Sequence, residues 1–314
     1  MELTPAQQSV LELLRAPDRV RPEVDPSLRS ELRRRLETEL APAAALLTAP
    51  LFVSKAALGR VLACEANQVA EAASPFEWSL ATARGTVAHK AVQLSIGRAD
   101  RVVPMALVDD SLERLSDDPG QGIAGFLLGL DPDERSELRD DVHRYVATFL
   151  ELWPPLLPAW QPQTESPRRA ELCGGMIVLS GRVDLTLGAP HGTVAGRIVV
   201  DIKTGRRQRV HADDLRFYAL LDTLRVGVPP FSLVSYYLDE GEFAPETVTE
   251  ETLEVAVRRT VDGATRLAQL AAGLRSPVAT PGPTCRWCRI RVTCPAAALG
   301  DEGPWSGEPG VDEL

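Results

Sequence analysis

Long apolar runs are missing from this sequence of 314 residues. No stretch is long enough to span a bilayer as a helix. The first residues, MELTPAQQSVLELL, lack the basic and apolar regions of a secretory signal. We therefore expect a cytoplasmic protein with no membrane partner. Hydrophobic residues make up 44% of the chain and charged residues 25%, as in soluble globular proteins with a substantial core.

Lysine is scarce, and acidic residues outnumber basic ones. The formal net charge is −10, and the only lysines are Lys55, Lys90 and Lys203; every other basic side chain, histidine aside, is arginine. This balance argues against a surface that wraps nucleic acid, although a local basic channel would still bind phosphates. Because arginine cannot replace lysine where a compact point charge is needed, the three lysines deserve individual inspection.

Cysteine is also uncommon, but three of the five cysteines lie within ten residues, as Cys285, Cys288 and Cys294. In a cytoplasmic chain, this C-x2-C-x5-C spacing indicates metal binding rather than disulfides. Cys64 is the candidate fourth ligand, although a lone cysteine on a helix is usually a packing residue. Cys173 has no partner spacing and is assigned to packing. Four thiolates suit either zinc or an iron–sulfur cluster.

Two predicted strands, residues 182–187 and 197–203, form a hairpin around a loop rich in glycine and proline. Alternation along the second strand places Val199, Asp201 and Lys203 on one face. If the strands pair, Asp184 lies close to Asp201. Two carboxylates and a lysine on an apolar sheet predict a divalent-metal site, since buried charges must be paired or bound. The alternative is a simple ion pair between Asp201 and Lys203.

Helical periodicity predicts a helix over 79–97, with Gly85, His89 and Gln93 on one face. His89 is either a structural histidine or a ligand. A second helix, 54–70, starts at the N-cap Ser54 and contains Cys64. Further helices are expected over residues 26–40, 213–226 and 249–274, the first of them ended by Pro42. Another helix is expected to start at Asp131. Strands are expected over 169–180 and 231–238, and a connector over 153–167.

The motifs G-T-V-A-H-K-A, G-R-V-D and D-I-K-T-G, in this order, resemble those of the RecB-type PD-(D/E)XK nucleases. The resemblance implies an α/β fold with a restriction-endonuclease-like core, in which helices flank a mixed central sheet. It covers residues 51–298 as a nuclease domain closed by four cysteines. Residues 1–50 are expected to form an N-terminal helical extension, and residues 299–314 an acidic disordered tail.

The resemblance further implies a metal-dependent DNA nuclease, expected to be an exonuclease of DNA ends in repair, recombination or defence. In that reading His89, Asp184, Asp201 and the Ile202 carbonyl hold Mg²⁺ or Mn²⁺. Lys203 orients or activates the attacking water.

The arrangement of one early and three late cysteines is similar to that of iron–sulfur nucleases such as AddB and the CRISPR spacer-processing nucleases. This implies a [4Fe–4S] cluster on Cys64, Cys285, Cys288 and Cys294, with Zn²⁺ as the alternative. The family's Q-x-x-x-Y motif is matched here by Asp214 and Tyr218, with aspartate in place of glutamine. Glu171 has the position of an acidic residue often found before the metal strand.

We expect Tyr218, Arg206 and Arg207 to contact DNA, although Tyr218 could equally be a core residue. The implied partner is DNA that is single-stranded or has a free end. No Walker phosphate loop occurs, so ATP-driven unwinding would need a helicase, and a CRISPR or defence protein is another implied partner. The alternative function is a non-catalytic iron–sulfur or zinc subunit that binds DNA as a scaffold in a helicase–nuclease complex.

Overall fold

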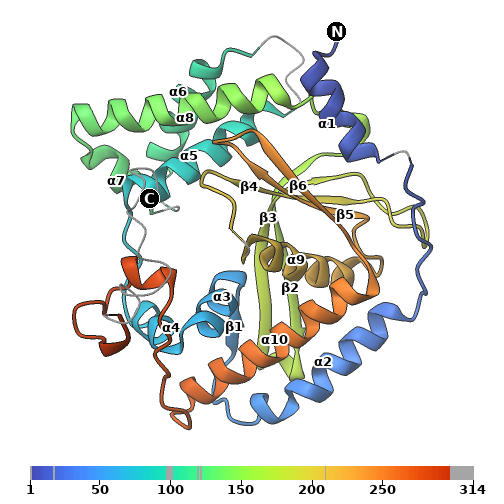
Figure 1. The fold of residues 1–314 in the computed structure, drawn as a ribbon, viewed down its shortest axis with the longest axis vertical. Coiled ribbons are helices and arrows are strands. Elements are labelled where there is room, and N and C mark those ends of the chain that lie inside the picture. Colours follow the sequence, from blue (N-terminus) through green and yellow to red (C-terminus); the bar gives the residue numbers. More distant parts are fainter. Residues whose placement is uncertain are drawn as a thin grey trace.

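One mixed sheet with helices on both faces forms the centre of the molecule (Figure 1). The computed structural model describes residues 2–16, 18–96, 102–118, 120, 122–208 and 210–297. The expected tail, 299–314, lies outside these residues. Within them, no helix is both long and apolar enough to cross a bilayer.

The sheet has the order β1-β3-β4-β5-β6, and β2 pairs with the other edge of β3. Two pairs, β1 with β3 and β4 with β5, are parallel, and the remaining pairs are antiparallel. The expected mixed sheet flanked by helices is therefore confirmed. The strands are β1 (Leu51–Val53), β2 (Gln163–Leu172), β3 (Ile177–Leu187), β4 (Ile198–Lys203), β5 (Ser232–Tyr237) and β6 (Glu242–Thr247).

The sheet forks between β3 and β4. On β3, residues 177–179 pair with β1 and residues 185–187 with β4, whereas β2 follows the whole opposite edge. The last antiparallel pair before the fork is Leu185 with Val200, and β4 then continues alongside β5 alone. Asp184 and Asp201 are the first residues beyond that pair. The fork thus places two carboxylates where backbone hydrogen bonding between the strands stops.

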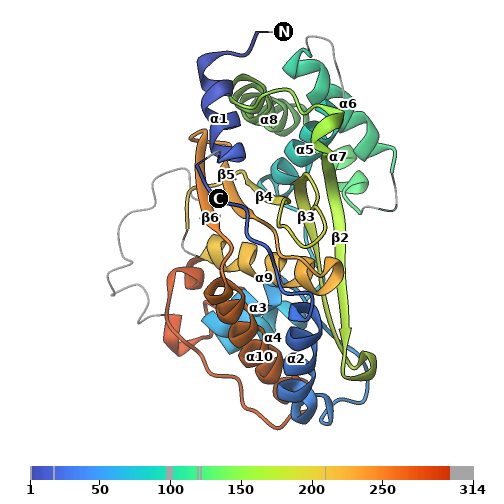
Figure 2. The ribbon, with the colours of Figure 1, turned by 90° about the vertical axis from the view of Figure 1, so that its right-hand side faces the viewer.

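Two layers of helices cover the sheet, as Figures 1 and 2 show. One core contains Val199 and Leu233 and packs under α2, α3, α9 and α10; the other contains Val200 and Val234 and packs under α1, α5, α6, α7 and α8. The predicted alternation of β4 is therefore confirmed. The bounds are α1 (Pro5–Arg15), α2 (Leu28–Ala44), α3 (Lys55–Ala63), α5 (Leu80–Ser95), α6 (Pro104–Ser116), α7 (Ala124–Gly129), α8 (Pro132–Leu152), α9 (Val210–Val226) and α10 (Glu250–Ala271).

The first half of the chain departs from prediction at two helices. The helix expected over 54–70 is two helices, α3 and α4 (Glu65–Ala72), because Cys64 adopts an extended conformation with φ −160° and ψ 112°. Pro42 does not end α2, which continues to Ala44. In the last turn a proline removes one hydrogen bond, and the buried side chains of Leu40 and Ala43 hold that turn against the core.

A turn interrupts the strand that was expected over residues 169–180. The chain reverses at the 3₁₀ turn Cys173–Gly175, where Gly174 and Gly175 have φ values of 65° and 88° that favour glycine. The end of the strand expected over 169–180 and the whole strand expected over 182–187 form one strand, β3, with Gly181 inside it. Consequently β2 begins at Gln163, within the predicted connector. Pro167 is tolerated there because β2 is an edge strand, which does not need every N–H group.

Candidate metal centre

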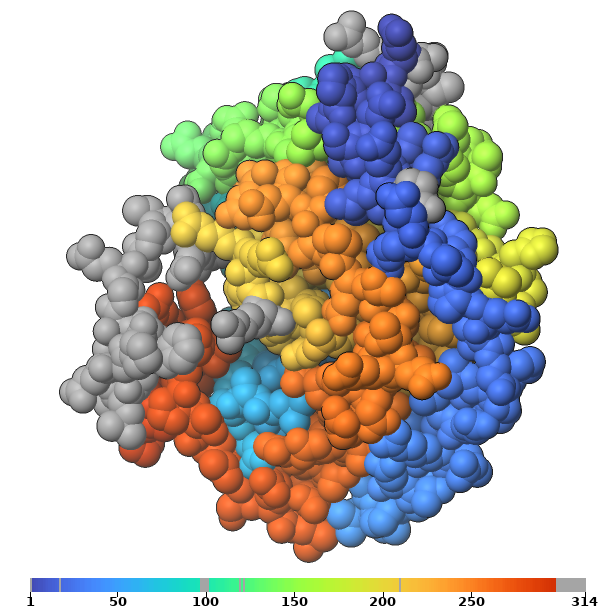
Figure 3. Space-filling view, turned by 45° about the vertical axis from the view of Figure 1, so that its right-hand side comes forward, coloured from blue at the N-terminus to red at the C-terminus, as the bar shows by residue number. Residues whose placement is uncertain are grey.

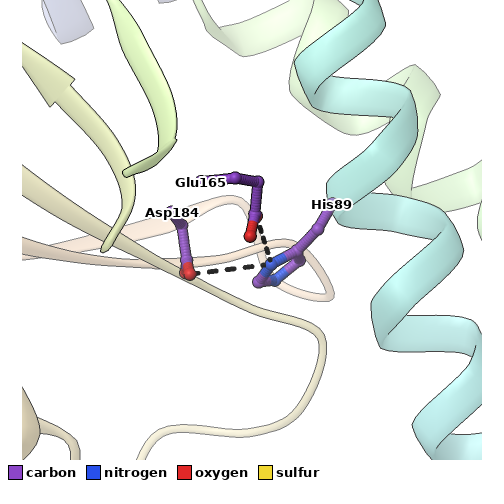
Figure 4. A group of neighbouring side chains, drawn as sticks. All are labelled: His89, Glu165 and Asp184. Atoms are coloured by element: carbon purple, nitrogen blue, oxygen red, sulfur yellow. Dashed lines mark ion pairs between the residues drawn. The ribbon is translucent and has the colours of Figure 1, made fainter. Parts of the chain in front are cut away.

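Three side chains from three elements converge beside the fork: His89 of α5, Glu165 of β2 and Asp184 of β3. One ligand atom of each lies within 4.8 Å of the others. The His89 Nδ1 atom is 3.5 Å from Glu165 Oε1 and 3.7 Å from Asp184 Oδ1, as Figure 4 shows. The helix that carries His89 is fixed at its start by a capping box between Ser79 and Thr82.

A break in the regular ladder aims the two carboxylates at His89. Glu165 has a left-handed φ of 48°, and it stands opposite Asp184 between the regular pairs Thr164–Leu185 and Ser166–Val183. Residues two apart in a strand normally share a face, yet Val183 packs in the α9 layer and Leu185 in the α5 layer. Such a backbone conformation costs on the order of 1–3 kcal/mol. The irregularity lets Glu165 and Asp184 project toward α5 together.

The peptide group of Ile202 completes this side of the site. Its N–H donates to Asp184 Oδ2 over 2.7 Å, so a side chain takes the place of the next interstrand hydrogen bond. Its carbonyl oxygen lies 2.9 Å from His89 Nε2. The structure therefore brings His89, Asp184 and the Ile202 carbonyl together, as the sequence motifs indicated.

On the opposite face of β4, Asp201 lies between two lysines. Asp201 is 1% exposed. Its Oδ1 accepts a hydrogen bond of 2.8 Å from Lys55 Nζ, and its Oδ2 lies 2.7 Å from Lys203 Nζ in an ion pair. That pair lacks hydrogen-bond geometry, so within the described part of the chain Oδ2 is a buried oxygen that accepts no hydrogen bond.

Asp214 joins both lysines from α9. Its Oδ2 is 3.4 Å from Lys203 Nζ and 3.9 Å from Lys55 Nζ. The aspartate that stands where the resemblance led us to expect glutamine thus takes part in the charge network of the site. Lys55 is a site residue that the motifs did not single out, whereas Asp214 has a motif position whose role the motif left open.

Burial and neighbouring charges shift the pKa values of the acidic and basic groups. Burial raises the pKa of Asp184 to about 6, against the lowering effect of His89. For His89, burial acts to lower the pKa, but Asp184 and Glu165 together raise it to about 9. Burial would raise the pKa of Asp201, and the ammonium groups of Lys203 and Lys55 hold it below its usual value instead. The site without a cation therefore retains protons that a cation would displace.

The residues present fit a hard divalent cation. Carboxylate and carbonyl oxygens suit Mg²⁺ and Mn²⁺, and Mn²⁺ also accepts an imidazole. Asp201 offers a buried oxygen that accepts no hydrogen bond. The four carboxylates of the group face two lysines, so a divalent ion beside a neutral His89 balances the charge. The carboxylates are Glu165, Asp184, Asp201 and Asp214.

Tyr218 is a core residue and not a surface contact for DNA. It is 2% exposed, its hydroxyl donates to the Arg182 carbonyl over 2.6 Å, and Lys55 Nζ lies 4.9 Å from its ring centroid. A Cβ atom at Gly181 would come within 2.6 Å of the Tyr218 ring, so the glycine makes room for it. Of the two alternatives for Tyr218, a DNA contact or a core residue, the structure therefore favours the core residue, whose ring packs against the Lys55 ammonium group.

Arg206 and Arg207 are exposed in the loop that follows β4. Glu171 does not join the site, because it is exposed on the far part of β2 and pairs with Arg169 at 2.8 Å. The acidic residue that does join is Glu165. Sequence reasoning missed it since the segment reads as a connector, whereas Lys55 carried a signal as one of only three lysines.

The cysteine segments from the two ends of the domain lie side by side. The Ala66 N–H donates to the Val278 carbonyl over 3.2 Å. Cys64 Sγ lies 3.4 Å from the Thr280 N–H, and Cys288 Sγ lies 3.3 Å from Asn67 Nδ2. In the described part of the chain, however, no three cysteine sulfurs lie within 4.8 Å of one another. Cys173 lies apart, with its thiol 3.6 Å from the Glu37 carbonyl.

The forked mixed sheet, with buried carboxylates and an adjacent lysine at the fork, fits the family that the sequence comparison identifies, a family of nucleases, which are hydrolases that cleave nucleic-acid phosphodiesters. The family profile of the PD-(D/E)XK nuclease superfamily matches residues 53–295, and the chain belongs to this superfamily.

Two solved structures resemble the chain at low sequence identity. One, named "Putative exonuclease" and from Eubacterium rectale, has 12% identity and a TM-score of 0.47, covering 82% of this chain and 91% of its own. The other, SSO0001, has 17% identity and a TM-score of 0.35, covering 83% of this chain and 94% of its own. No curated protein matches the sequence.

Proposed function

We propose that this chain is a metal-dependent deoxyribonuclease that acts on DNA ends. The observation that carries the proposal is the convergence of His89, Glu165 and Asp184 on one side of the fork, with Asp201 and Lys203 on the other. The choice of DNA and of ends rests on the resemblance of the motifs to RecB-type nucleases.

In this proposal the Ile202 carbonyl, His89, Asp184 and Asp201 hold Mg²⁺ or Mn²⁺, and Glu165 adds a carboxylate next to His89. When bound, the ion lowers the pKa of a coordinated water and offsets charge that develops on the phosphate. Lys203 orients the attacking water and stabilises the transition state. Asp201 at 2.7 Å and Asp214 at 3.4 Å hold its ammonium group in position.

The surface near the fork supports access of a nucleic-acid strand. The loop after β4, which carries Arg206 and Arg207, borders a hollow together with α3, α4 and the cysteine segment (Figure 3). Exposed arginines beside a cleavage site attract phosphates although the chain as a whole is acidic.

The test is cleavage of end-labelled DNA by the purified full chain. Linear single-stranded, linear double-stranded and circular single-stranded substrates are incubated with Mg²⁺, Mn²⁺ or EDTA. We expect stepwise shortening of a linear substrate, no cut in the circle and no reaction in EDTA. Asp184→Asn should lose the activity, and Asp262→Asn, which changes an exposed carboxylate on α10, should keep it.

Cleavage of the circle would replace the exonuclease proposal with an endonuclease. DNA binding without cleavage in any divalent ion would instead support the non-catalytic scaffold subunit. Because the sequence holds no Walker loop, a partner such as a helicase would supply any ATP-driven unwinding. We propose no direct contact site for such a partner.

We further propose that Cys64, Cys285, Cys288 and Cys294 bind a [4Fe–4S] cluster. Supporting this are the adjacent segments and the N–H donors beside Cys64 and Cys288, since hydrogen bonds to the sulfurs tune such clusters. The arrangement of one early and three late cysteines favours the cluster over zinc through its resemblance to iron–sulfur nucleases. Stoichiometric zinc without iron in anaerobically purified protein would establish the zinc alternative.

A further inference from the structure

Lys55 occupies a position that helix stability does not explain. It is the first residue of α3, directly after the N-cap Ser54. The N-terminal end of a helix carries partial positive charge, so a lysine there is unfavourable unless an anion compensates it. The compensating group is Asp201, which accepts a hydrogen bond of 2.8 Å from Lys55 Nζ. Lys55 is therefore held by the cleavage site rather than by its own helix.

The surroundings of Lys55 provide a second place for its ammonium group. Asp214 Oδ2 is 3.9 Å away, and the Tyr218 ring lies below. A small cavity of about 10 Å³, room for one water, is lined by Lys55 and Asp214 and borders α10. The side chain of Lys55 is 26% exposed, compared with 1% for Asp201. A shift from Asp201 to Asp214 thus needs only a small side-chain rotation, and the ammonium group stays in contact with solvent.

The charge balance of the site connects this shift to cation binding. The carboxylates of Asp201 and Asp214 are neutralised by Lys55 and Lys203 while the site lacks a cation. A divalent ion on Asp201 would compete for the two oxygens that now lie 2.8 and 2.7 Å from the lysine Nζ atoms, and at such short range it would repel both ammonium groups. Lys203 follows Asp201 by two residues on β4 and must stay near it, whereas Lys55 comes from a separate helix.

We propose that Lys55 is a second lysine of the cleavage site: it occupies Asp201 in place of a divalent cation, and on cation binding it moves to Asp214 and contacts a DNA phosphate. This inference rests on the proposed function. Lys55 and the cation compete for Asp201, so each weakens binding of the other. The phosphate adds the negative charge that the released ammonium group then neutralises.

The first experiment measures Mn²⁺ binding to the metal-free full chain by calorimetry, without DNA. Lys55→Met should bind Mn²⁺ about fivefold more tightly than wild type, a shift typical of coupled binding. Asp214→Asn should bind it more weakly, because both lysines then stay on Asp201. Lys90→Met is the matched control, since it removes a lysine that bonds Gln93 outside this network, and it should leave the Mn²⁺ affinity unchanged.

The second experiment measures DNA affinity by fluorescence anisotropy with a single-stranded oligonucleotide. Lys203→Met serves as the background because it should slow cleavage far enough for binding to be measured on intact DNA. Adding Lys55→Met should weaken DNA binding about tenfold in Mn²⁺ and less than about twofold in EDTA, where Asp201 already engages Lys55. A loss of equal size in both conditions would contradict the proposed movement.

The sign of the Mn²⁺ result decides the inference. Weaker Mn²⁺ binding by Lys55→Met would mean that Lys55 positions Asp201 as a ligand, and unchanged binding would mean a purely structural ion pair; either overturns it. If Lys55→Met does not fold, the opposite shift expected of Asp214→Asn still tests it. His89→Gln separates this inference from the proposed function. If this variant binds Mn²⁺ as tightly as wild type, the ion does not bind at the proposed site, and the proposed function fails rather than the role of Lys55 alone.

Discussion

The group at the fork of the sheet and the group of four cysteines differ in what holds their side chains in place. Each of the three residues at the fork, His89, Glu165 and Asp184, lies within a helix or strand. The regular hydrogen bonding of that element continues before and after the residue along the chain, apart from the local break at Glu165. Cys64 lies between two helices, and Cys285 and Cys288 lie in a short 3₁₀ segment and just after it. The carboxylate group is therefore assembled by the fold, whereas the sulfurs are only brought into the same region.

The comparison teaches that the two sites depend on their metals differently. A site held by a sheet keeps its geometry in EDTA, and its ion contributes chiefly to chemistry. Cysteines on irregular segments gain their arrangement from the metal, so the binding free energy becomes folding free energy. Removing a ligand should accordingly affect activity at the fork and stability at the cysteines.

The largest effect is expected from Lys203→Met. Loss of the ammonium group should lower cleavage by about 10²–10³-fold, as when one transition-state donor is removed. Asp201 keeps its hydrogen bond to Lys55, so the fold should remain. Single-turnover rates and circular dichroism measure both outcomes. If Lys203→Met unfolded, the fork would also depend on its charged residues for stability, and the contrast with the cysteines would be wrong.

The second prediction concerns pH. The metal-free pKa of His89 is about 9 and that of Asp184 about 6, both above their usual values. A cation must displace these protons, so Mn²⁺ affinity should rise by up to about tenfold per pH unit through the range 6 to 9, and more steeply below it. Calorimetric titrations across pH test this, with His143→Gln as a histidine control from α8.

The same shifts determine how stability in EDTA should vary. Because both folded-state pKa values are raised, their contribution to stability is fully present at low pH. It is lost as the pH rises through about 6 and then about 9. His89→Gln should flatten the upper part of this dependence in thermal melts, and a melting temperature that rises with pH because of His89 would contradict the assignment.

The third prediction sharpens the description of the fork. Glu165→Gln should weaken Mn²⁺ binding by about tenfold, the size of effect seen when a group that supports a metal ligand is lost. Glu171→Gln changes a glutamate of the same strand that lies away from the site, and it should bind Mn²⁺ as wild type does. Equal affinities in the two variants would remove Glu165 from the site.

The smallest effect on activity is expected at the cysteines. Cys64→Ala should lose its iron and lower the melting temperature by roughly 5 °C, the shift that about 2 kcal/mol produces in a large domain. Cleavage per folded molecule should fall by less than about threefold. Cys173→Ala should retain full iron. Iron content per folded monomer is the deciding measurement, and full iron in Cys64→Ala would mean that another residue is the fourth ligand.

Patterns in the sequence predicted the parts of the site that lie on regular elements. Alternation placed Asp201 and Lys203 on one face of a strand, and helical spacing placed His89, because both periods follow from backbone geometry alone. Glu165 could not be predicted in this way. Its left-handed φ breaks the alternation, and Pro167, two residues further on, made the segment look like a connector.

Long-range contacts were the other limit. Lys55 pairs with Asp201 on β4 and with Asp214 on α9, which are far from Lys55 in the sequence, and no local period encodes these contacts. The turn at Cys173–Gly175 was missed since several glycines offered alternative turn positions. One helix was predicted in place of α3 and α4 because no proline or glycine marks the break at Cys64.

The left-handed backbone at Glu165 has a consequence for how this position can vary. Among the twenty amino acids, glycine, asparagine and aspartate accept that conformation most readily, yet only aspartate among them also offers a carboxylate. A library randomised at position 165 and selected for cleavage should therefore retain glutamate and aspartate. The same library screened only for folded protein should instead enrich glycine and asparagine, so the two selections would give different residue spectra at one site.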